Sequence, residues 1–502
     1  MSFSQDAKSK SPTFHVEDNE KGGSESDMAV QEEREADRRL RNKLDRRIVP
    51  SAAFIYLLCY LDRSNIGNAK LLNSESGNSL MQSLSLTNLQ YTIALMVDNS
   101  KRDSDAVIIN TRSRQVFLIA YISFEVPSNY CLKRFSPSRW IAFLMFSWGA
   151  LTISLGGVHS YGSLTAVRFL LGTFEAGLFP GLVYFFTFWY RPEERSLRVA
   201  LVLASSTLAG KFGVLCAFGG AIAYGVGFMN MTAGLEAWRW LFILEGIPSI
   251  LSSILVWFFF PDFPETAKWL SSDERDRVVR RLEGVASTHH SRVSWAEAKQ
   301  TLLGWRVWVH AIAYITISAP FSSLSLFSPT IVAGLGYEGL DAQLFTVPPY
   351  ACAYFVTLFL SWFADTRNQR SLVSAGSMAV GAFAFLAQAL LPQNAFKARF
   401  GFLCIAASGS FGSIPPLLGW LSTNVRGAGA VGLAIAINIS MGGTGQIIGV
   451  WIYKANEKPG YITGHMTNFA MLLFGSMVVC GLRFYYTRQN QRMGHGDLKW
   501  AL

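Results

Sequence analysis

The sequence predicts an all-α polytopic membrane protein with twelve transmembrane helices in two pseudo-symmetric bundles of six. Three observations support this prediction. Half of the 502 residues are hydrophobic, and the mean hydropathy is positive, at +0.26. The apolar residues come in blocks of about twenty, the length that a helix needs to cross the hydrocarbon core. The longest polar stretch between blocks, residues 261–306, lies near the middle of the chain and separates two groups of six.

The blocks define the predicted spans and domains. The first six spans cover 48–67, 89–126 (interrupted), 139–158, 162–189, 198–224 and 238–260. The second six cover 307–332, 344–363, 371–391, 400–421, 427–453 and 463–486. The predicted domains are a disordered, polar N-terminal tail (1–47), a first bundle (48–260), a central loop (261–306), a second bundle (307–487) and a C-terminal tail (488–502). In two-bundle transporters the substrate lies near mid-membrane between the halves.

The distribution of basic residues predicts the orientation of the helices. The chain carries a net charge of +10. When the N-terminus is placed in the cytosol, most Lys and Arg residues fall on the two tails and the even-numbered loops. This bias toward cytosolic segments is the usual signature of membrane topology. The basic excess therefore indicates cytosolic tails and a cytosolic central loop, and not a surface for nucleic acid.

Cysteines and reactive side chains do not indicate an enzyme. All six cysteines fall in or at the ends of predicted spans, where they fit small apolar packing residues. Their spacing matches neither a metal site nor a disulfide framework. No soluble domain and no pairing of a nucleophile with a base is recognisable. We therefore expect no catalytic residue and no metal.

Four ionisable residues lie where charge is costly. Asp62 and Arg63 close the first span, and Arg168 and Glu175 lie inside the fourth. A charged side chain at bilayer depth costs several kcal/mol or so unless it is paired or hydrated. Arg168 and Glu175, seven residues apart, share one helix face at about 10 Å, whereas Asp62 and Arg63 diverge by about 100°. Such residues either act on a solute or a proton, or pair to hold helices together.

Residues 98–115 interrupt the second predicted span with a polar, strongly charged stretch. The apolar flanks, 89–96 and 116–126, are each too short to cross alone, since about 20 residues are needed, but joined they would form one span. We interpret 98–115 as an insertion that results from a retained intron or a gene-model error. The alternative is a genuine loop, extruded into a cavity or out of the bundle, which would break span two.

Several motifs resemble a known family. Residues 61–69, Leu-Asp-Arg-Ser-Asn-Ile-Gly-Asn-Ala, are similar to the first-helix signature of the anion:cation symporter family of the major facilitator superfamily. Further matches follow in the family's order, at Phe124–Asn129, Arg168–Pro180, Trp238–Gly246, Val347–Tyr350 and Ala364–Asp365. The chain most resembles the fungal allantoate/nicotinate permease branch, over about residues 48–487. The resemblance implies the major facilitator fold and a transport function.

The resemblance also implies roles for the charged residues. In that family an Arg at the position of Arg63 contacts the substrate carboxylate, and an Arg at that of Arg168 stabilises the charged network. Acidic residues at the positions of Asp62 and Glu175 take part in proton coupling. A guanidinium can bind a carboxylate through two parallel hydrogen bonds. A carboxyl group in a poorly solvated cavity can load and unload a proton near neutral pH.

Other polar residues in the spans are weaker candidates. With Arg63 and Arg168, the predicted substrate site contains Asn65, Tyr350 and Asn438. The remaining pathway candidates are Glu125, Asn129, Lys211, His310 and Gln446. Lys211 departs from the family pattern, which has a small or apolar residue there, and it either adds charge to the cavity, snorkels or stays neutral. Polar residues in membrane helices also serve simply to link helices.

We therefore expect a proton-coupled importer of a small organic anion, such as allantoate, nicotinate, pantothenate or a related carboxylate, in a fungal plasma membrane. Its partners would be the anion, the proton and the lipid bilayer, in a monomer that the proton gradient drives without a cofactor. One alternative is a nutrient sensor that does not transport, although the C-terminal tail is short for signalling. Another is an inactive product of the insertion.

The insertion hypothesis makes a direct prediction about the messenger RNA. Sequencing of the mature transcript should show that residues 98–115 are not encoded, because a continuous second span needs its flanks joined. A mature message that encodes this stretch would contradict the hypothesis.

Overall fold

The computed structural model describes residues 18–71, 79–84, 116–211, 225–282, 295–334, 345, 347–425, 430–454, 457, 460–493 and 499–502. The chain divides into two units, residues 1–50 and 51–502, each of which is described by itself. In the described ranges the regular structure is helical, without a strand. The predicted insertion at 98–115 lies outside the described residues, as do the side chains of Arg63, Asn65 and Lys211.

The N-terminal unit is helical where it is described. Helix α1 begins at Asp18 and ends at Leu71, so the prediction of a disordered tail over 1–47 is wrong from Asp18 onward. The physical reason is local. The last turns before the membrane are rich in Glu, Arg, Lys, Leu and Ala, which all favour a helix. Glu35 and Arg39, one turn apart, add an ion pair of 3.5 Å.

In the second unit, the part of α1 from Ser51 onward is followed by five further spans in the first half. They are α5 (Val116–Phe135), α6 (Pro137–Leu155), α7 (Tyr161–Glu175) joined to α8 (Leu178–Trp189), α9 (Arg195–Lys211) and α11 (Ala237–Phe259). The predicted end of span two at residue 126 is wrong, because α5, 20 residues long, ends only at Phe135. It stops where Ser136 takes a positive φ of 75° before Pro137 opens α6. The flank that begins at 116 is therefore longer than the eleven residues on which the joined-span argument rested.

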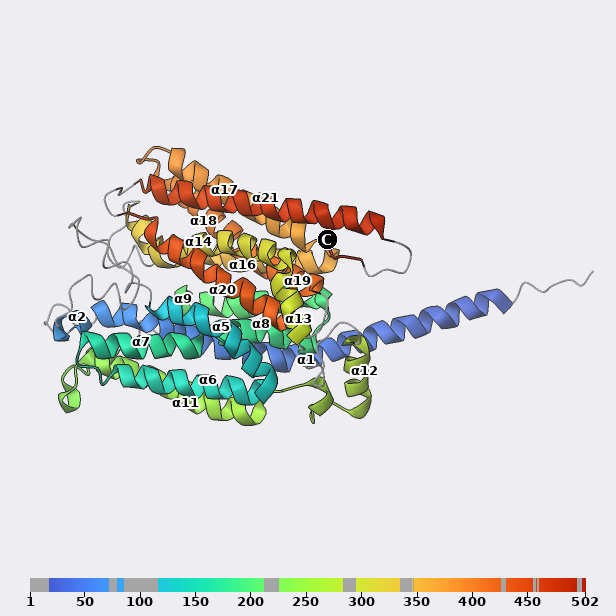
Figure 1. Ribbon diagram of the computed structural model, residues 1–502, viewed down its shortest axis with the longest axis horizontal. Helices are drawn as coiled ribbons and strands as arrows, with labels where there is room; N and C mark the ends of the chain where they lie inside the picture. The colour runs from blue at the N-terminus through green and yellow to red at the C-terminus, as the bar shows by residue number, and fades with distance from the viewer. Residues whose placement is uncertain are drawn as a thin grey trace, which may run out of the picture. The chain divides into compact units, whose positions relative to one another are not determined.

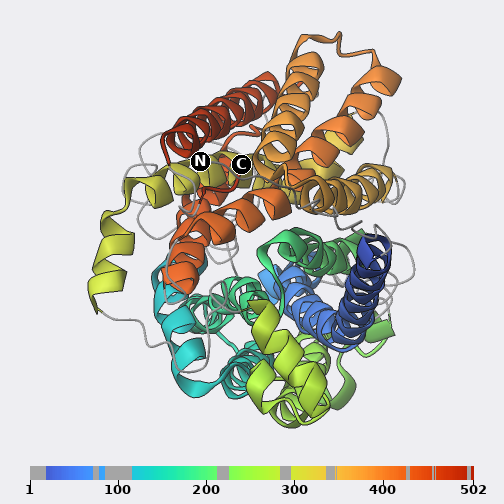
Figure 2. The same cartoon turned by 90° about the vertical axis from the view of Figure 1, so that its right-hand side faces the viewer.

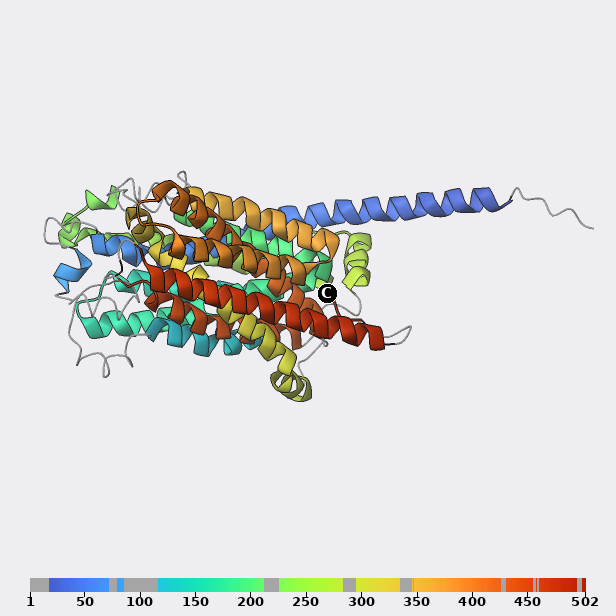
Figure 3. The same cartoon turned by 90° about the horizontal axis from the view of Figure 1, so that it is seen from above.

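The second half contains six spans. They are α14 (Trp305–Gly334), α16 (Val347–Arg367), α17 (Arg370–Leu390), α18 (Phe396–Gly412) joined to α19 (Ile414–Asn424), α20 (Ala430–Trp451) and α21 (Ile462–Arg492). Helix α21 runs past the predicted bundle end at 487 and lies alongside α17 (Figures 1 and 3). In the sequence, two short helices come between the halves, α12 (Ser272–Leu282) and α13 (Trp295–Leu303).

The arrangement confirms the predicted fold class. Seen along the helices, the residues from Ser51 onward form two groups, one from the first half and one from the second (Figure 2). Nine spans in the described part of the chain are long and apolar enough to cross a membrane. The helices α1, α5 and α9 supply the other three positions of the twelve-helix plan.

Small residues allow helices within each half to pack closely. In the first half Gly149 of α6 faces Gly246 of α11, where an added Cβ would lie 2.7 Å from the Gly149 carbonyl oxygen. In the second half a Cβ on Gly409 of α18 would lie 2.6 Å from the Cα of Gly381 on α17. Membrane helices associate through such close backbone approach, because lipid gives them little hydrophobic driving force to associate.

Replacement of Gly409 by Ala should destabilise the protein by roughly 1–3 kcal/mol, because the new methyl group overlaps the backbone of α17. The matched control is Gly401→Ala on the same helix, where an added Cβ meets nothing within 4 Å. Thermal unfolding of the purified protein in detergent measures both. Equal melting temperatures for the two variants would contradict the packing argument.

Candidate functional site

A buried cluster of ionisable residues lies inside the first half. Asp62 on α1 is 2% exposed, and the hydroxyl of Ser249 on α11 donates a hydrogen bond of 2.6 Å to its Oδ2. Arg168 and Glu175 of α7 lie within electrostatic reach of Asp62. Asp62 therefore points toward α11, into the interior of the first half. The cluster brings together three of the four residues that the sequence singled out, and the side chain of Arg63 lies outside the described residues.

The spacing of Arg168 and Glu175 predicts correctly that they share a helix face. Both belong to the buried side of α7. Glu175 is the last residue of this helix, and α8 continues the span three residues later. At the break, Gly177 lies so close to α5 that an added Cβ would overlap the Ser128 hydroxyl. The break therefore places a carboxylate at a fixed point inside the membrane span.

Glu245 completes the cluster, and the sequence reasoning gave it no role. It lies one turn before Ser249 on α11, is 8% exposed, and lies within electrostatic reach of Asp62. Neither carboxylate oxygen of Glu245 has a hydrogen-bond partner among the described residues. The signal was present in the sequence, because Glu245 stands alone in the apolar span 238–260 and the same cost argument applies to it.

A second polar group lies at the seam between the two halves. Glu125 of α5 is fully buried, and both it and Tyr56 of α1 lie within electrostatic reach of the Tyr314 hydroxyl on α14. On the same face of α5, the amide of Asn129 donates to the Gly432 carbonyl of α20 at 3.0 Å. Two of the predicted pathway residues therefore lie where the halves meet, and Asn129 links them directly.

His310 and Asn438 form a further buried polar region within the second half. Gly442 of α20 packs against Tyr314 of α14, and one turn earlier on each helix come Asn438 and His310. Both residues are buried, and their side-chain nitrogens and oxygen have no hydrogen-bond partner within the described ranges. The ring of His310 instead meets Trp420 edge to face at 4.6 Å. These two predicted pathway residues therefore have free hydrogen-bonding capacity.

The other two predicted residues of the second half have different surroundings. The hydroxyl of Tyr350 donates to the Leu324 carbonyl of α14 at 2.8 Å and lies 3.1 Å from the Ser328 hydroxyl. Tyr350 thus links α16 to α14 in this conformation and has its donor occupied. Gln446 on α20 is only half-buried.

An ion pair between α16 and α17 connects the halves at the end of the bundle that carries residues 191–198 and 365–370, which we call the charged end. Nε of Arg370 lies 3.0 Å from Asp365 Oδ1. Asp365 Oδ2 accepts a hydrogen bond of 2.9 Å from the backbone of Leu197, at the start of α9 in the first half. Arg370 also donates to the Pro192 carbonyl at 2.7 Å and to the Ser196 hydroxyl at 3.2 Å. The carboxylate of Asp365 is stabilised at the N-terminus of α9, because a helix N-terminus carries partial positive charge.

Arg195 adds a second connection at the charged end. Its guanidinium donates to the backbone carbonyl and the hydroxyl of Ser422 on α19, both at 3.5 Å, and to the Tyr190 carbonyl at 3.1 Å. A guanidinium keeps its charge when it is buried, so these are charge-assisted hydrogen bonds. The halves are therefore held together by charged hydrogen bonds at this end.

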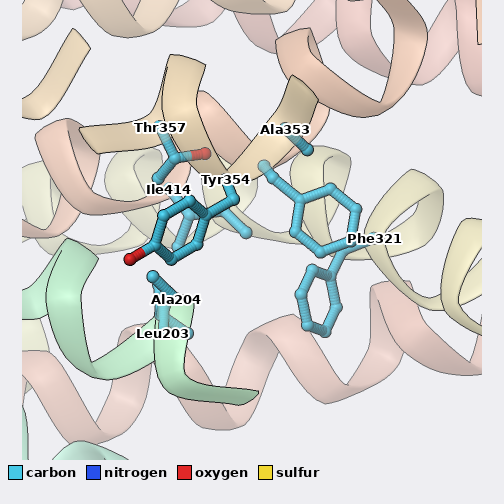
Figure 4. A pocket seen from close by; sticks show the side chains of 8 residues that line it. Leu203, Ala204, Phe321, Ala353, Tyr354, Thr357 and Ile414 are labelled. Carbon is cyan, nitrogen blue, oxygen red and sulfur yellow. The ribbon is translucent and has the colours of Figure 1, made fainter. Parts of the chain in front are cut away.

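A small cavity lies at the seam between the halves. A cavity of about 10 Å³ lies between Leu203 and Ala204 of α9 and residues of the second half, among them Tyr354 and Thr357 (Figure 4). Its remaining lining residues are Phe321, Ala353, Phe411 and Ile414. This volume holds at most about one water molecule. At this point of the seam the described residues leave no room for an organic substrate.

The described spans thus form two groups that meet at a charged seam. A family model described as "Major Facilitator Superfamily" matches residues 52–450 of this chain. The chain belongs to the major facilitator superfamily. It is therefore a multi-pass membrane transporter and not an enzyme.

Relatives and solved structures agree with this assignment. The "MFS transporter prlL" of Fungal sp. (strain NRRL 50135) is 55% identical over 482 residues, which cover 95% of this chain and 92% of that protein. The "MFS-type transporter cnsO" of Penicillium expansum is 31% identical and covers 92% and 86%. The proton:xylose symporter XylE has the same fold, with a TM-score of 0.60 at 15% identity, over 88% of this chain and 95% of that one.

Loss of the Ser249 hydroxyl should destabilise this transporter by roughly 1–3 kcal/mol, because it leaves a buried oxygen of Asp62 without its donor. Ser253→Ala is the matched control, since the Ser253 hydroxyl donates to the Ile250 carbonyl of its own helix. Thermal unfolding of Ser249→Ala and the control in detergent measures the difference. A Ser249→Ala variant as stable as the control would show that the hydrogen bond does not hold α1 to α11.

Proposed function

We propose that this transporter couples the uptake of a small organic anion to the movement of protons down their gradient. The observation that carries the proposal is the burial of Asp62, Glu175 and Glu245 together with Arg168 inside the first half. Of these four side chains, three are acidic and one is basic. A single guanidinium cannot neutralise three carboxylates in a medium of low dielectric constant. Proton uptake by the cluster is the least costly way to balance its charge.

The guanidinium of Arg168 supports the choice of an anion as cargo. A planar guanidinium can hold a carboxylate through two parallel hydrogen bonds, and it remains charged when it is buried. When Glu175 takes up a proton, Arg168 has one fewer negative charge nearby and attracts an external anion more strongly. Proton and anion would then bind with positive coupling, and the coupling is necessarily reciprocal. Arg63, in the same motif as Asp62, is proposed as the second cationic contact of the substrate.

The resemblance of the motifs to the anion:cation symporter family, and within it to the allantoate/nicotinate permease branch, supports a ureide or vitamin carboxylate as substrate. The bias of basic residues toward the charged end supports a cytosolic location for that end and for both termini. We propose a monomer in the plasma membrane, driven by the proton gradient without a cofactor.

Uptake by the intact chain tests the proposal. The full chain and a variant with residues 98–115 deleted are each expressed in a transport-deficient yeast. Labelled allantoate, nicotinate and pantothenate are then supplied at two external pH values. Uptake of at least one anion should rise as the external pH falls and should collapse with a protonophore. Uptake of an anion that does not respond to pH or to the protonophore would contradict proton coupling.

Glu175→Gln should abolish the pH dependence of uptake and prevent accumulation against a gradient, because the amide cannot bind the coupled proton. Asp276→Asn on the exposed face of α12 is the control for an acid-to-amide change. Initial uptake rates between pH 5 and pH 8 measure both variants. Survival of the pH dependence in Glu175→Gln would remove Glu175 from the coupling mechanism.

A further inference from the structure

The last described residues of the chain, 499–502, are bound to the charged end of the second half (Figure 1, mark C). Two asparagine side chains recognise their backbone. The side-chain amide of Asn490 on α21 donates to the Trp500 carbonyl at 2.8 Å and accepts from its N–H at 2.7 Å. Asn424 on α19 pairs in the same way with Ala501, at 3.1 and 2.8 Å. Each amide thus satisfies both backbone polar groups of one residue.

The side chain of Trp500 occupies an aromatic site of its own. It is 7% exposed and stacks on Tyr486 of α21, with ring centroids 5.2 Å apart and planes 12° from parallel. The guanidinium of Arg306, at the start of α14, lies 4.3 Å from the centre of a Trp500 ring. A further hydrogen bond runs from the indole N–H of Trp420 to the Ala501 carbonyl at 2.8 Å. Stacking and cation–π contacts with tryptophan are among the stronger interactions of aromatic side chains.

We infer that α14, α19 and α21 form a peptide-binding site at the charged end, and that its ligand is the chain's own segment 499–502. The backbone contacts select an extended segment, and the aromatic contacts select tryptophan at the first of the two recognised positions. A tether of a few residues, 494–498, separates α21 from the bound segment. Such a short link gives an effective concentration of about millimolar, so even a weak site is filled by its own chain before a free competitor.

The site lies next to the contact that closes the seam. Trp420 and Asn424 of α19 hold the segment, and Ser422, between them in sequence, accepts the hydrogen bonds of Arg195 from the first half. The end of α19 is therefore fixed by the bound segment and by Arg195 together. The segment contributes to the closed arrangement by ordering the helix end that Arg195 binds. This inference concerns closure of the transporter and stands whether or not the cargo is an organic anion.

Binding of a peptide in trans tests the site. The probe is a fluorescein-labelled peptide of residues 498–502, and the receptor is the otherwise intact protein with residues 494–502 removed. Fluorescence anisotropy should show saturable binding to this truncated protein and at least about tenfold weaker binding to the full chain, whose site is filled. The peptide with Trp500 replaced by Ala should bind at least about tenfold more weakly, since a loss of about 1.4 kcal/mol is one factor of ten.

Several outcomes would overturn the inference. Absence of saturable binding to the truncated protein would remove the site. Equal binding to the truncated and full-length proteins would show that the chain's own segment does not occupy it. A full chain that is dimeric, and that becomes monomeric on removal of 494–502, would show that a second copy supplies the segment.

Hydrogen exchange of the full-length protein tests the effect on closure. Trp500→Ala should speed exchange about tenfold in residues 420–425 and also across the seam in residues 195–200, whose Leu197 N–H is bound by Asp365. Trp257→Ala is the matched control, because Trp257 is exposed on α11, 48% of its surface accessible. Faster exchange in 420–425 alone would overturn the role in closure, and unchanged exchange in both regions would overturn the bound segment altogether.

Discussion

The ion pair of Arg370 and Asp365 is the interaction on which the observed conformation depends most. Both groups are buried at the charged end, and each also binds the first half, Arg370 through the Pro192 carbonyl and Asp365 through the Leu197 N–H. Removal of one partner from a buried pair costs about 3–5 kcal/mol, because the other charge stays uncompensated. The pair therefore acts on the seam as a unit. The contact of Arg195 with Ser422 and the small, closed cavity require the same approach of the halves.

Buried charge is balanced differently in the interior of the first half than at the charged end. At the charged end two buried cations, Arg370 and Arg195, each have oxygen partners from the opposite half. Among the described side chains of the cluster around Asp62, three acids accompany one arginine, Arg168, and both oxygens of Glu245 lack a partner there. The two regions therefore differ in how their charge is balanced: the charged end holds the halves together, and the acid cluster is where we propose that protons bind.

One helix of the first half leads from the seam to the charged end, and another leads from the seam to the acid cluster. Helix α9 begins at the charged end, where Leu197 binds Asp365, and its residues Leu203 and Ala204 reach the small cavity at the seam. Helix α5 carries Glu125 at the seam, and at Ser128 it touches the break beside Glu175. A rotation of one half against the other that opens the charged end must move both helices. Helix α9 therefore links the charged end to the seam, and helix α5 links the seam to the break beside Glu175.

The sequence alone determined the fold class, the superfamily and most members of the buried charged cluster. Span length and apolar composition decide where a helix can cross, and the seven-residue spacing put Arg168 and Glu175 on one face without reference to any neighbour. Reasoning from the sequence did not identify Glu245 as a member of the cluster, and it placed the end of α5 too early. Only the tertiary structure decided which charges meet: Asp62 turns toward Ser249, Asp365 reaches across to α9, and residues 499–502 fill a site on three helices. Partners that lie far apart in sequence are chosen by packing, which local periodicity does not encode.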